Sequence, residues 1–231
     1  MPRPLNLNIL VQNPIIAIDG FASTGKSTVA RALSQHFRLP FIDSGAFYRG
    51  ITLFAIENGF VKNNKVDQGG LEPKLTELDF KYDSSSSHLY LNGQDISEKI
   101  RQPEIAQHVS SISSIDFVRD FVLKELRALG TDGLVMDGRD IGTVVFPHAD
   151  YKFFFIAKPE VRAQRRYQEL KEKGVVTSYQ EVLNNLIHRD KTDSGREVAP
   201  LVKAEDAIEI DTSELNAQEV LSSAVQIIES K

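Results

Sequence analysis

The residues best suited to chemistry form a glycine-rich stretch near the start of the chain. Residues 20–27 read Gly-Phe-Ala-Ser-Thr-Gly-Lys-Ser, with the spacing G-x-x-x-x-G-K-S, and they follow an apolar run at residues 15–18. A strand, a glycine-rich turn and then a helix form the context in which this motif binds phosphate. The turn and the first turn of the helix point N–H groups into one hollow, and Lys26 can reach the β- and γ-phosphates. The Ser27 hydroxyl can ligate Mg²⁺.

Polar side chains also follow two later apolar segments. Ser44 and Arg49 come after residues 40–42, and the run Asp137-Gly138-Arg139-Asp140 comes after residues 134–136. The carboxyl ends of parallel strands meet at one edge of a sheet, so we expect these groups to converge on Lys26. A second set of arginines follows later in the chain: Arg162, Arg165, Arg166, Arg189 and Arg196.

This equipment suits phosphoryl transfer. The rate of that reaction comes mainly from alignment and from neutralising the charge on the phosphoryl oxygens. Planar guanidinium groups grip phosphate at two points, which favours arginine over lysine. Each of these arginines could instead be a solvated surface residue, and for Arg162 and Arg165 the two interpretations compete evenly. The two carboxylates, Asp137 and Asp140, could be buried partners of arginines instead of ligands.

The order of the expected elements predicts an α/β fold with a parallel sheet flanked by helices. Expected strands lie at residues 15–18, 40–42, 134–136, 151–156 and 207–211, and expected helices at 26–37, 46–58, 159–173, 178–192 and 217–229. Residues 60–129 interrupt this order with a hairpin at 78–91 and helices that begin at 103 and 116. We predict a P-loop core of residues 1–59 and 130–231, interrupted by a small α+β insertion of residues 60–129.

Composition narrows the partners. The chain has 231 residues, a net charge of −5, no cysteine and 41% hydrophobic residues. An acidic chain is a poor nucleic-acid coat or anionic-membrane binder, so we expect neither partner. The absence of cysteine fits a reducing cytoplasm. Residues 1–13 lack the pattern of a signal peptide, and no apolar run is long enough to span a bilayer.

Three segments together carry a resemblance to a known family. They are residues 43–49 (Asp-Ser-Gly-Ala-Phe-Tyr-Arg), residues 137–147 (Asp-Gly-Arg-Asp-Ile-Gly-Thr-Val-Val-Phe-Pro), and Arg189-Asp190 with Asp193, Arg196 and residues 199–201 (Ala-Pro-Leu). The chain resembles the bacterial cytidylate kinases, which are P-loop nucleoside monophosphate kinases, over nearly its whole length. The motif D-G-R-D-x-G-T-V-V-F-P is far more specific than a P-loop alone.

The resemblance implies an enzyme that transfers the γ-phosphoryl group of ATP to CMP or dCMP with Mg²⁺, and we expect a monomer. It also implies that the insertion of residues 60–129 is part of a monophosphate-binding region and that residues of about 158–196 form a helical lid. It implies that the ATP phosphates bind Gly20, Phe21, Ala22, Ser23, Thr24, Gly25, Lys26, Ser27 and Thr28. It implies acceptor contacts from Ser44, Tyr48, Arg49, Ser110, Arg119, Arg139, Asp140, Arg189, Asp193 and Arg196. Of these residues, Lys26, Arg49, Arg139, Arg189 and Arg196 are the candidates for stabilising the transferred phosphoryl group.

Base selection by this set has a physical rationale. Cytosine presents a ring-nitrogen acceptor, a carbonyl acceptor and an amino donor, so Arg119 and Ser110 can serve the acceptors and Asp140 the amino group. Uracil would place a carbonyl opposite the Asp140 carboxylate, and a mismatched buried carboxylate should cost more than about 1–3 kcal/mol.

Two departures from the family pattern and two chance matches complete the survey. Phe21 and Thr24 stand in a loop that more often reads Gly-Pro-Ser-Gly-Ala-Gly, and residues 189–196 carry fewer arginines than many relatives have. Residues 64–67 match the guanine-reading N-K-x-D pattern but lie too close to the P-loop, so we interpret them as a surface turn. Residues 188–190 resemble a protein-kinase catalytic loop but lack its asparagine.

Two rival functions remain open at this point. One is a small P-loop kinase for another monophosphate or metabolite, and the other is a nucleotide-dependent switch that binds without turnover. We also expect the lid and the insertion to close on substrate and exclude water.

Overall fold

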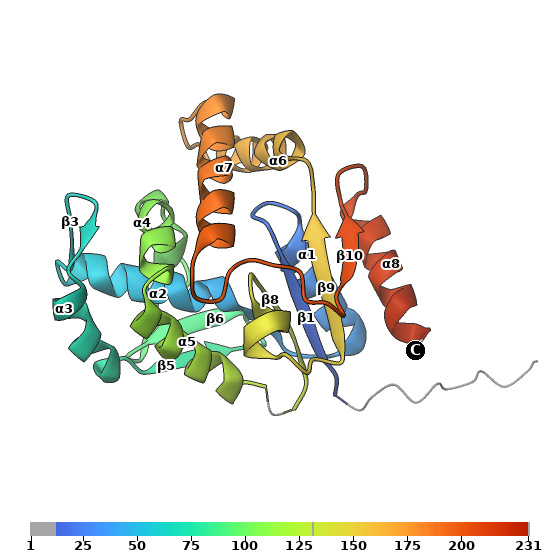
Figure 1. Ribbon diagram of the computed structural model, residues 1–231, viewed down its shortest axis with the longest axis horizontal. Coiled ribbons are helices and arrows are strands. Elements are labelled where there is room, and N and C mark those ends of the chain that lie inside the picture. Colours follow the sequence, from blue (N-terminus) through green and yellow to red (C-terminus); the bar gives the residue numbers. More distant parts are fainter. Residues whose placement is uncertain (1–12, 131, 231) are drawn as a thin grey trace, which may run out of the picture.

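A five-stranded parallel sheet forms the centre of the molecule in the computed structural model, which describes residues 13–130 and 132–230. The strand order is β10-β9-β1-β8-β2 (Figure 1). The strands are β1 (Ile15–Gly20), β2 (Phe41–Asp43), β8 (Leu134–Gly138), β9 (Tyr151–Ile156) and β10 (Ile208–Asp211). This arrangement confirms the predicted α/β fold. The segment expected to lack a signal peptide lies, except for Asn13, outside the described residues.

Helices cover both faces of this sheet. The alternation along β1 sets the two faces, because Ile16 and Ile18 join one apolar cluster while Ala17 joins the other. The helices α1 (Lys26–Phe37) and α8 (Ala217–Glu229) pack on the Ile16 side. The helices α2 (Ser44–Glu57) and α5 (Asp116–Ala128) pack on the Ala17 side. Two-sided cover explains why the central strands read as continuous apolar runs.

The insertion builds two small sheets of its own beside α2 (Figure 1). The predicted hairpin is confirmed by β5 (Phe80–Asp83) and β6 (His88–Leu91), which pair with Phe80 opposite Leu91. The remaining elements are β3 (Val61–Lys62), β4 (Lys65–Val66), α3 (Gln68–Leu71), η1 (Glu72–Glu77), β7 (Gln94–Asp95), η2 (Lys99–Arg101) and α4 (Pro103–Ser113). The N-K-x-D match begins at Asn64, in the tight turn between β3 and β4 where Asn63 and Asn64 have positive φ, and continues along β4 to Asp67.

Two helices stand beyond the carboxyl ends of the strands (Figure 1). They are α6 (Pro159–Glu172) and α7 (Tyr179–Gly195), joined by a turn in which Gly174 has φ of 71°. Their contact is apolar and includes Ala163, Val182 and Leu186. No described helix has both the length and the apolar character needed to cross a membrane.

Several element boundaries differ from the expected ones, and three of these differences bear on the site. β1 runs two residues further because Asp19 pairs with Gly138 and Gly20 with Phe155 in the sheet. α2 begins at Ser44, two residues early, and the Ser44 hydroxyl donates to the Asp137 carbonyl. α7 continues to Gly195 rather than Thr192, because the Asp193 carboxylate is bound by Arg139.

Between β8 and β9 lies one element that the sequence did not predict. Residues Ile141–Val145 form a short π-helical turn, η3, directly after Asp140. It packs against the end of β1, which places it beside the phosphate loop.

Candidate active site

The phosphate loop joins β1 to α1 in a shape that requires glycine. Gly20 has φ of 142°, and a Cβ there would lie 2.1 Å from the Phe155 carbonyl oxygen. Gly25 has φ of 90° and caps the start of α1. Left-handed backbone of this kind turns consecutive N–H groups to one side, which is the geometry of an anion nest.

Side chains hold the carbonyl groups of this loop. The Phe21 carbonyl accepts from Thr24 Oγ1 at 3.0 Å and from Lys26 Nζ at 2.5 Å. The Ala22 carbonyl accepts from Arg162, and the Thr24 carbonyl accepts from Thr212 Oγ1 at 2.9 Å. Carbonyl oxygens that already accept hydrogen bonds repel an anion less. The N–H groups of the loop are then the polar groups left to bind a phosphate.

Lys26 lies between the phosphate loop and the arginines. Burial lowers the pKa of Lys26 well below its ordinary value, and the charge of Arg139 lowers it further. The carboxylates of Asp137, Asp19 and Asp193 oppose this shift. A buried lysine and an arginine whose charges act on each other are suited to bind an anion.

Ser27 and Asp137 form a pair of hard oxygen donors beside Lys26. Ser27 Oγ donates to Asp137 Oδ2 at 2.5 Å, and Asp137 Oδ1 is buried with no hydrogen-bond partner within the described residues. Burial raises the pKa of Asp137 to about 6, with Asp43 adding to the shift and the Ser27 hydroxyl opposing it. Hydroxyl and carboxylate oxygens, one of them unengaged, fit the coordination preferences of Mg²⁺.

A buried ion pair marks the opposite side of the site. Arg119 in α5 and Asp140 after β8 are each 5% exposed, and Arg119 Nη2 donates to Asp140 Oδ2. The Tyr48 ring lies 5.4 Å from the guanidinium carbon of Arg119, and burial raises the pKa of Tyr48. A buried ion pair on its own contributes little to stability, so Arg119 and Asp140 stay candidates for recognition of a ligand.

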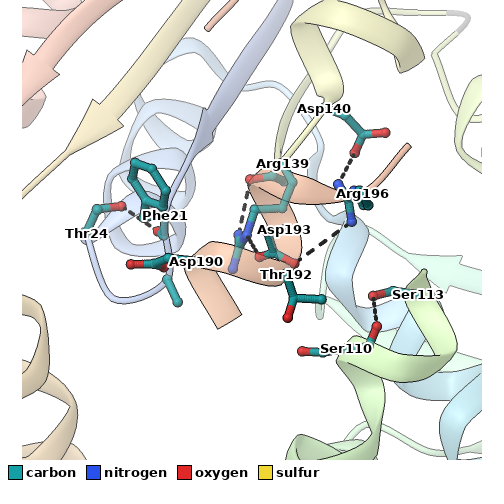
Figure 2. A network of polar contacts seen from close by, with 12 residues as sticks. Phe21, Thr24, Ser110, Ser113, Arg139, Asp140, Asp190, Thr192, Asp193 and Arg196 are labelled. Atoms are coloured by element: carbon teal, nitrogen blue, oxygen red, sulfur yellow. Dashed lines mark hydrogen bonds and ion pairs between the residues drawn. The ribbon is translucent and has the colours of Figure 1, made fainter. Parts of the chain in front are cut away.

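Further arginines lie around Asp193 in α7 (Figure 2). Arg139 Nε donates to Asp193 Oδ2 at 2.9 Å, and Arg196 lies 3.9 Å from Asp193 Oδ1 and 4.0 Å from Asp140 Oδ1. Arg189 lies one turn before Asp193 in α7, and burial together with the charge of Arg139 lowers the pKa of Arg189 to about 10. The buried atoms Arg119 Nε, Arg189 Nε and Arg196 Nη2 have no hydrogen-bond partner within the described part of the chain. Buried guanidinium groups that carry a positive charge and have unpaired donors are suited to bind an anionic ligand.

Arg49 is held by a carboxylate at the edge of this group. Arg49 Nη2 donates to Asp43 Oδ2 at 2.6 Å, and although burial favours the neutral acid, Arg49 holds the pKa of Asp43 below its ordinary value. The charge of Arg49 also acts on Arg189, which places the two arginines in one neighbourhood. Ser110 lies in α4 and faces the Arg196 side in Figure 2.

Comparison with known proteins decides the family. The family model for cytidylate kinase matches residues 16–230. The chain belongs to the cytidylate kinase family. Among curated relatives it is similar to the cytidylate kinase of Flavobacterium johnsoniae, with 43% identity over 92% of this chain and 95% of that protein. The cytidylate kinase of Bacteroides fragilis is 44% identical over 88% and 91%, and that of Clostridioides difficile is 42% identical over 94% and 98%.

One solved structure supports the fold alone. A protein from Eubacterium ventriosum superposes on 95% of this chain and 99% of its own, with a TM-score of 0.51 and 12% sequence identity. The predicted resemblance to the cytidylate kinase family is thus confirmed by sequence, and the predicted fold by the parallel sheet and its flanking helices.

The structure separates the later arginines into two kinds. Arg162 is 3% exposed and forms a two-point contact with Asp190, and Arg165 donates to Thr212 and to the Leu215 carbonyl. Neither arginine is the solvated surface residue that was the alternative to phosphate binding, because both are engaged by groups of the phosphate loop, α7 or the segment after β10. The contact with Arg162 also accounts for Asp190 without a protein-kinase-like role.

Sequence reasoning missed three residues that the cytidylate kinase fold brings to this site. Asp43 pairs with Arg49, Thr212 holds the phosphate loop, and Asp19 accepts two backbone N–H groups beneath it. Their positions in the sequence could have identified these residues as site candidates. Each is a carboxylate or hydroxyl residue at or directly after the carboxyl end of an apolar strand.

Proposed function

We propose that this chain transfers the γ-phosphoryl group of ATP to CMP or dCMP, giving ADP and CDP or dCDP. The donor phosphates bind residues 20–28. The acceptor phosphate binds arginines from three places: Arg139 directly after β8, Arg49 in α2, and Arg189 and Arg196 in and directly after α7. The names of the curated relatives support this activity, and the site described above supports it independently.

The proximity of the donor loop and the strand end that carries Arg139 is the observation that supports the proposal. Ser27, next to Lys26, donates to Asp137, two residues before Arg139, and the charge of Arg139 lowers the pKa of Lys26. Both cations then lie within reach of one transferring phosphoryl group, which needs charge neutralisation on its equatorial oxygens. Arg49, Arg189 and Arg196 complete the charge around the acceptor phosphate. In-line transfer requires little else of the protein, because alignment supplies most of the rate.

Selection of the base falls to Arg119, Asp140 and Ser110. Arg119 can donate to the acceptors of cytosine, and the Asp140 carboxylate can accept from its amino group. Their existing ion pair holds both side chains in place before the base arrives, which lowers the cost of ordering them on binding. Asp193 and Arg189 then lie near the ribose, and Tyr48 and Ser44 line the pocket.

Mg²⁺ fits beside the donor phosphates. Ser27 and Asp137 would hold it, and when bound it would neutralise part of the charge on the β- and γ-phosphates. Only two protein ligands are needed, because Mg²⁺ usually keeps several waters and takes the rest from substrate phosphates.

The lid and the insertion are proposed to close over both nucleotides. The lid is residues 158–196 and the insertion residues 60–129, each attached to the core of residues 1–59 and 130–231. The Gly174 turn between α6 and α7, with φ of 71°, supplies one flexible point. Closure would exclude water and limit wasteful hydrolysis of ATP. Spin labels on α7 and α8 should move closer together only when both nucleotides are bound.

An acceptor panel in an ADP-release assay tests the proposal. We expect ADP release with CMP and dCMP that exceeds release with UMP, AMP and GMP, and dependence on Mg²⁺. A different preferred acceptor would favour another small P-loop kinase. Slow ADP release that no acceptor stimulates would favour a nucleotide-dependent switch.

The state of assembly and the location remain predictions. We propose a monomer and a cytoplasmic location, the latter from the absence of cysteine. Light scattering of the purified protein would measure the first.

A further inference from the structure

Asp19 is a buried carboxylate to which the proposed reaction gives no role. It stands at the end of β1, directly before the phosphate loop, and is 4% exposed. Its two oxygens accept hydrogen bonds from the backbone N–H groups of Ile141 at 2.8 Å and Gly142 at 2.7 Å. Within the described residues it forms no ion pair. Burial raises the pKa of Asp19 to about 6, although the hydrogen bonds from both N–H groups oppose this shift. Burying this charged group therefore costs free energy of folding.

The bonds from Asp19 fix one end of a two-residue bridge. Gly138 is held in the sheet, in register with Asp19 itself. Ile141 is held by the Asp19 carboxylate, and only Arg139 and Asp140 lie between these two fixed points. The loop has little room to shift, because a Cβ on Gly138 would lie 2.6 Å from both Ser44 Oγ and Ile141 Cδ1.

The turn η3 transmits the same constraint from the other side. The Asp140 carbonyl accepts from the N–H groups of Val144 at 2.9 Å and Val145 at 3.1 Å, so Asp140 begins this turn. Asp19 binds the first two N–H groups of η3, where a carboxylate is favoured by the backbone dipoles. A shift of η3 would therefore move the backbone of Asp140.

The chain continues from Asp19 straight into the donor loop. Gly20 lies against the Phe155 carbonyl, with no space for a side chain. The position of Asp19 is thereby tied to the sheet and to the start of the phosphate loop at once. One side chain connects the donor loop to the loop that carries Arg139 and Asp140.

We propose that Asp19 is a positioning residue, which holds Arg139 and Asp140 in register with the phosphate loop so that the acceptor is aligned with the donor. This inference rests on the proposed function, because it assigns Arg139 to the acceptor phosphate and Asp140 to the base. Asp19 itself touches neither substrate. Its removal should harm acceptor binding and base selection more than ATP binding.

The first test replaces Asp19 with asparagine. The variant Asp19→Asn keeps the size of the side chain but turns one acceptor into an NH₂ group, which faces a backbone N–H. We expect kcat/KM for CMP to fall about 10- to 100-fold, the loss typical of a broken hydrogen bond to a charged group. The preference for CMP over UMP should fall as well, while KM for ATP stays near the wild-type value. An unchanged CMP-to-UMP preference would overturn the proposal, whatever the loss of overall rate or stability.

The control is Asp150→Asn. Asp150 directly precedes β9, and its carboxylate binds the first residue of β1, at the end of that strand opposite to Asp19. Asp150 Oδ2 accepts from the Ile15 N–H at 2.8 Å, the same kind of bond far from the site. This variant should lose some thermal stability and keep its acceptor preference. A similar loss of preference in Asp150→Asn would also overturn the proposal, because strand anchoring in general would then be the cause.

Hydrogen exchange on the wild-type chain supplies a second test in case Asp19→Asn does not fold. The Ile141 and Gly142 amides should exchange as slowly as the amides of β1. Exchange many times faster would show that the bonds to Asp19 open independently of the core, and the proposal would fail. The acceptor panel on the wild-type protein distinguishes failure of the proposed function from failure of the positioning role of Asp19. Wild-type protein that is inactive on CMP would overturn the proposed function. The exchange rates of the Ile141 and Gly142 amides would still report whether Asp19 holds the loop.

Discussion

The donor and acceptor sides of the candidate site are built by different means. The donor side is one continuous segment, residues 20–28, whose backbone supplies most of the binding groups. The acceptor side draws Arg49, Arg119, Arg139 and Arg196 from four separate places in the chain, and each of them is already paired with a carboxylate. A backbone nest is selective for charge and shape, whereas side chains on separate elements can select a base and can move when parts of the protein close.

The largest effect should follow from the loss of Lys26, the donor-side cation of the proposed site. Lys26→Met removes the cation that faces the transferring group, while the backbone nest stays intact. We expect kcat to fall by about 100- to 1,000-fold, as for other lost transition-state donors. Steady-state kinetics with CMP measures this, with the exposed Lys65→Met as control. A fall of less than tenfold would mean that the backbone alone stabilises the donor phosphates.

Loss of Asp140 should change selectivity more than rate. Asp140→Ala removes the acceptor for the cytosine amino group, so kcat/KM for CMP should fall by about 10- to 100-fold while that for UMP falls less. The variant Asp120→Ala, exposed on α5, is the control. An unchanged ratio of CMP to UMP would remove Asp140 from base recognition.

A milder change on the acceptor side is Arg196→Lys. Lysine keeps the charge but not the planar fork, so one contact replaces two and KM for CMP should rise by about tenfold. KM for ATP should change little. Arg38→Lys, at an exposed position after α1, should change neither constant. Equal rises in both KM values would contradict the assignment of Arg196 to the acceptor.

The smallest effect concerns stability and pH at Asp137. Its pKa is raised in the folded chain from 3.8 to about 6, so the unfolded chain binds fewer protons than the folded one between these values. Stability from this group is therefore lost as pH rises through about 6. Asp137→Asn removes the ionisable group. The free energy of unfolding of the variant minus that of the wild type should therefore be about 1 kcal/mol more favourable to the variant at pH 7.5 than at pH 5. Chemical denaturation at the two pH values measures this, and equal differences would contradict the shift.

Much of the donor side could be predicted from the sequence because its residues are adjacent. The spacing of Gly20, Gly25 and Lys26 specifies the loop, and the apolar run before it specifies the strand. Central strands were also predictable, since a strand buried on both faces reads as a continuous apolar run.

The acceptor side was less predictable, since contacts between distant segments depend on the whole fold. Nothing local to Arg162 distinguishes it from Arg189, yet the first binds Asp190 and the second lies beside Arg139. The turn η3 also escaped prediction. Its first two N–H groups bind Asp19, more than 100 residues away in the sequence.

A crystal structure with CMP and a non-hydrolysable ATP analogue tests the central claim most directly. The claim is that Arg49 and Arg139 bind the acceptor phosphate. Without substrate, their guanidinium groups bind the carboxylates of Asp43 and Asp193 instead, and the phosphate replaces these carboxylates. We predict that Arg49 leaves Asp43, that Arg139 loosens from Asp193, and that both contact the CMP phosphate opposite Lys26. Intact ion pairs at Asp43 and Asp193, with the CMP phosphate bound elsewhere, would contradict the account.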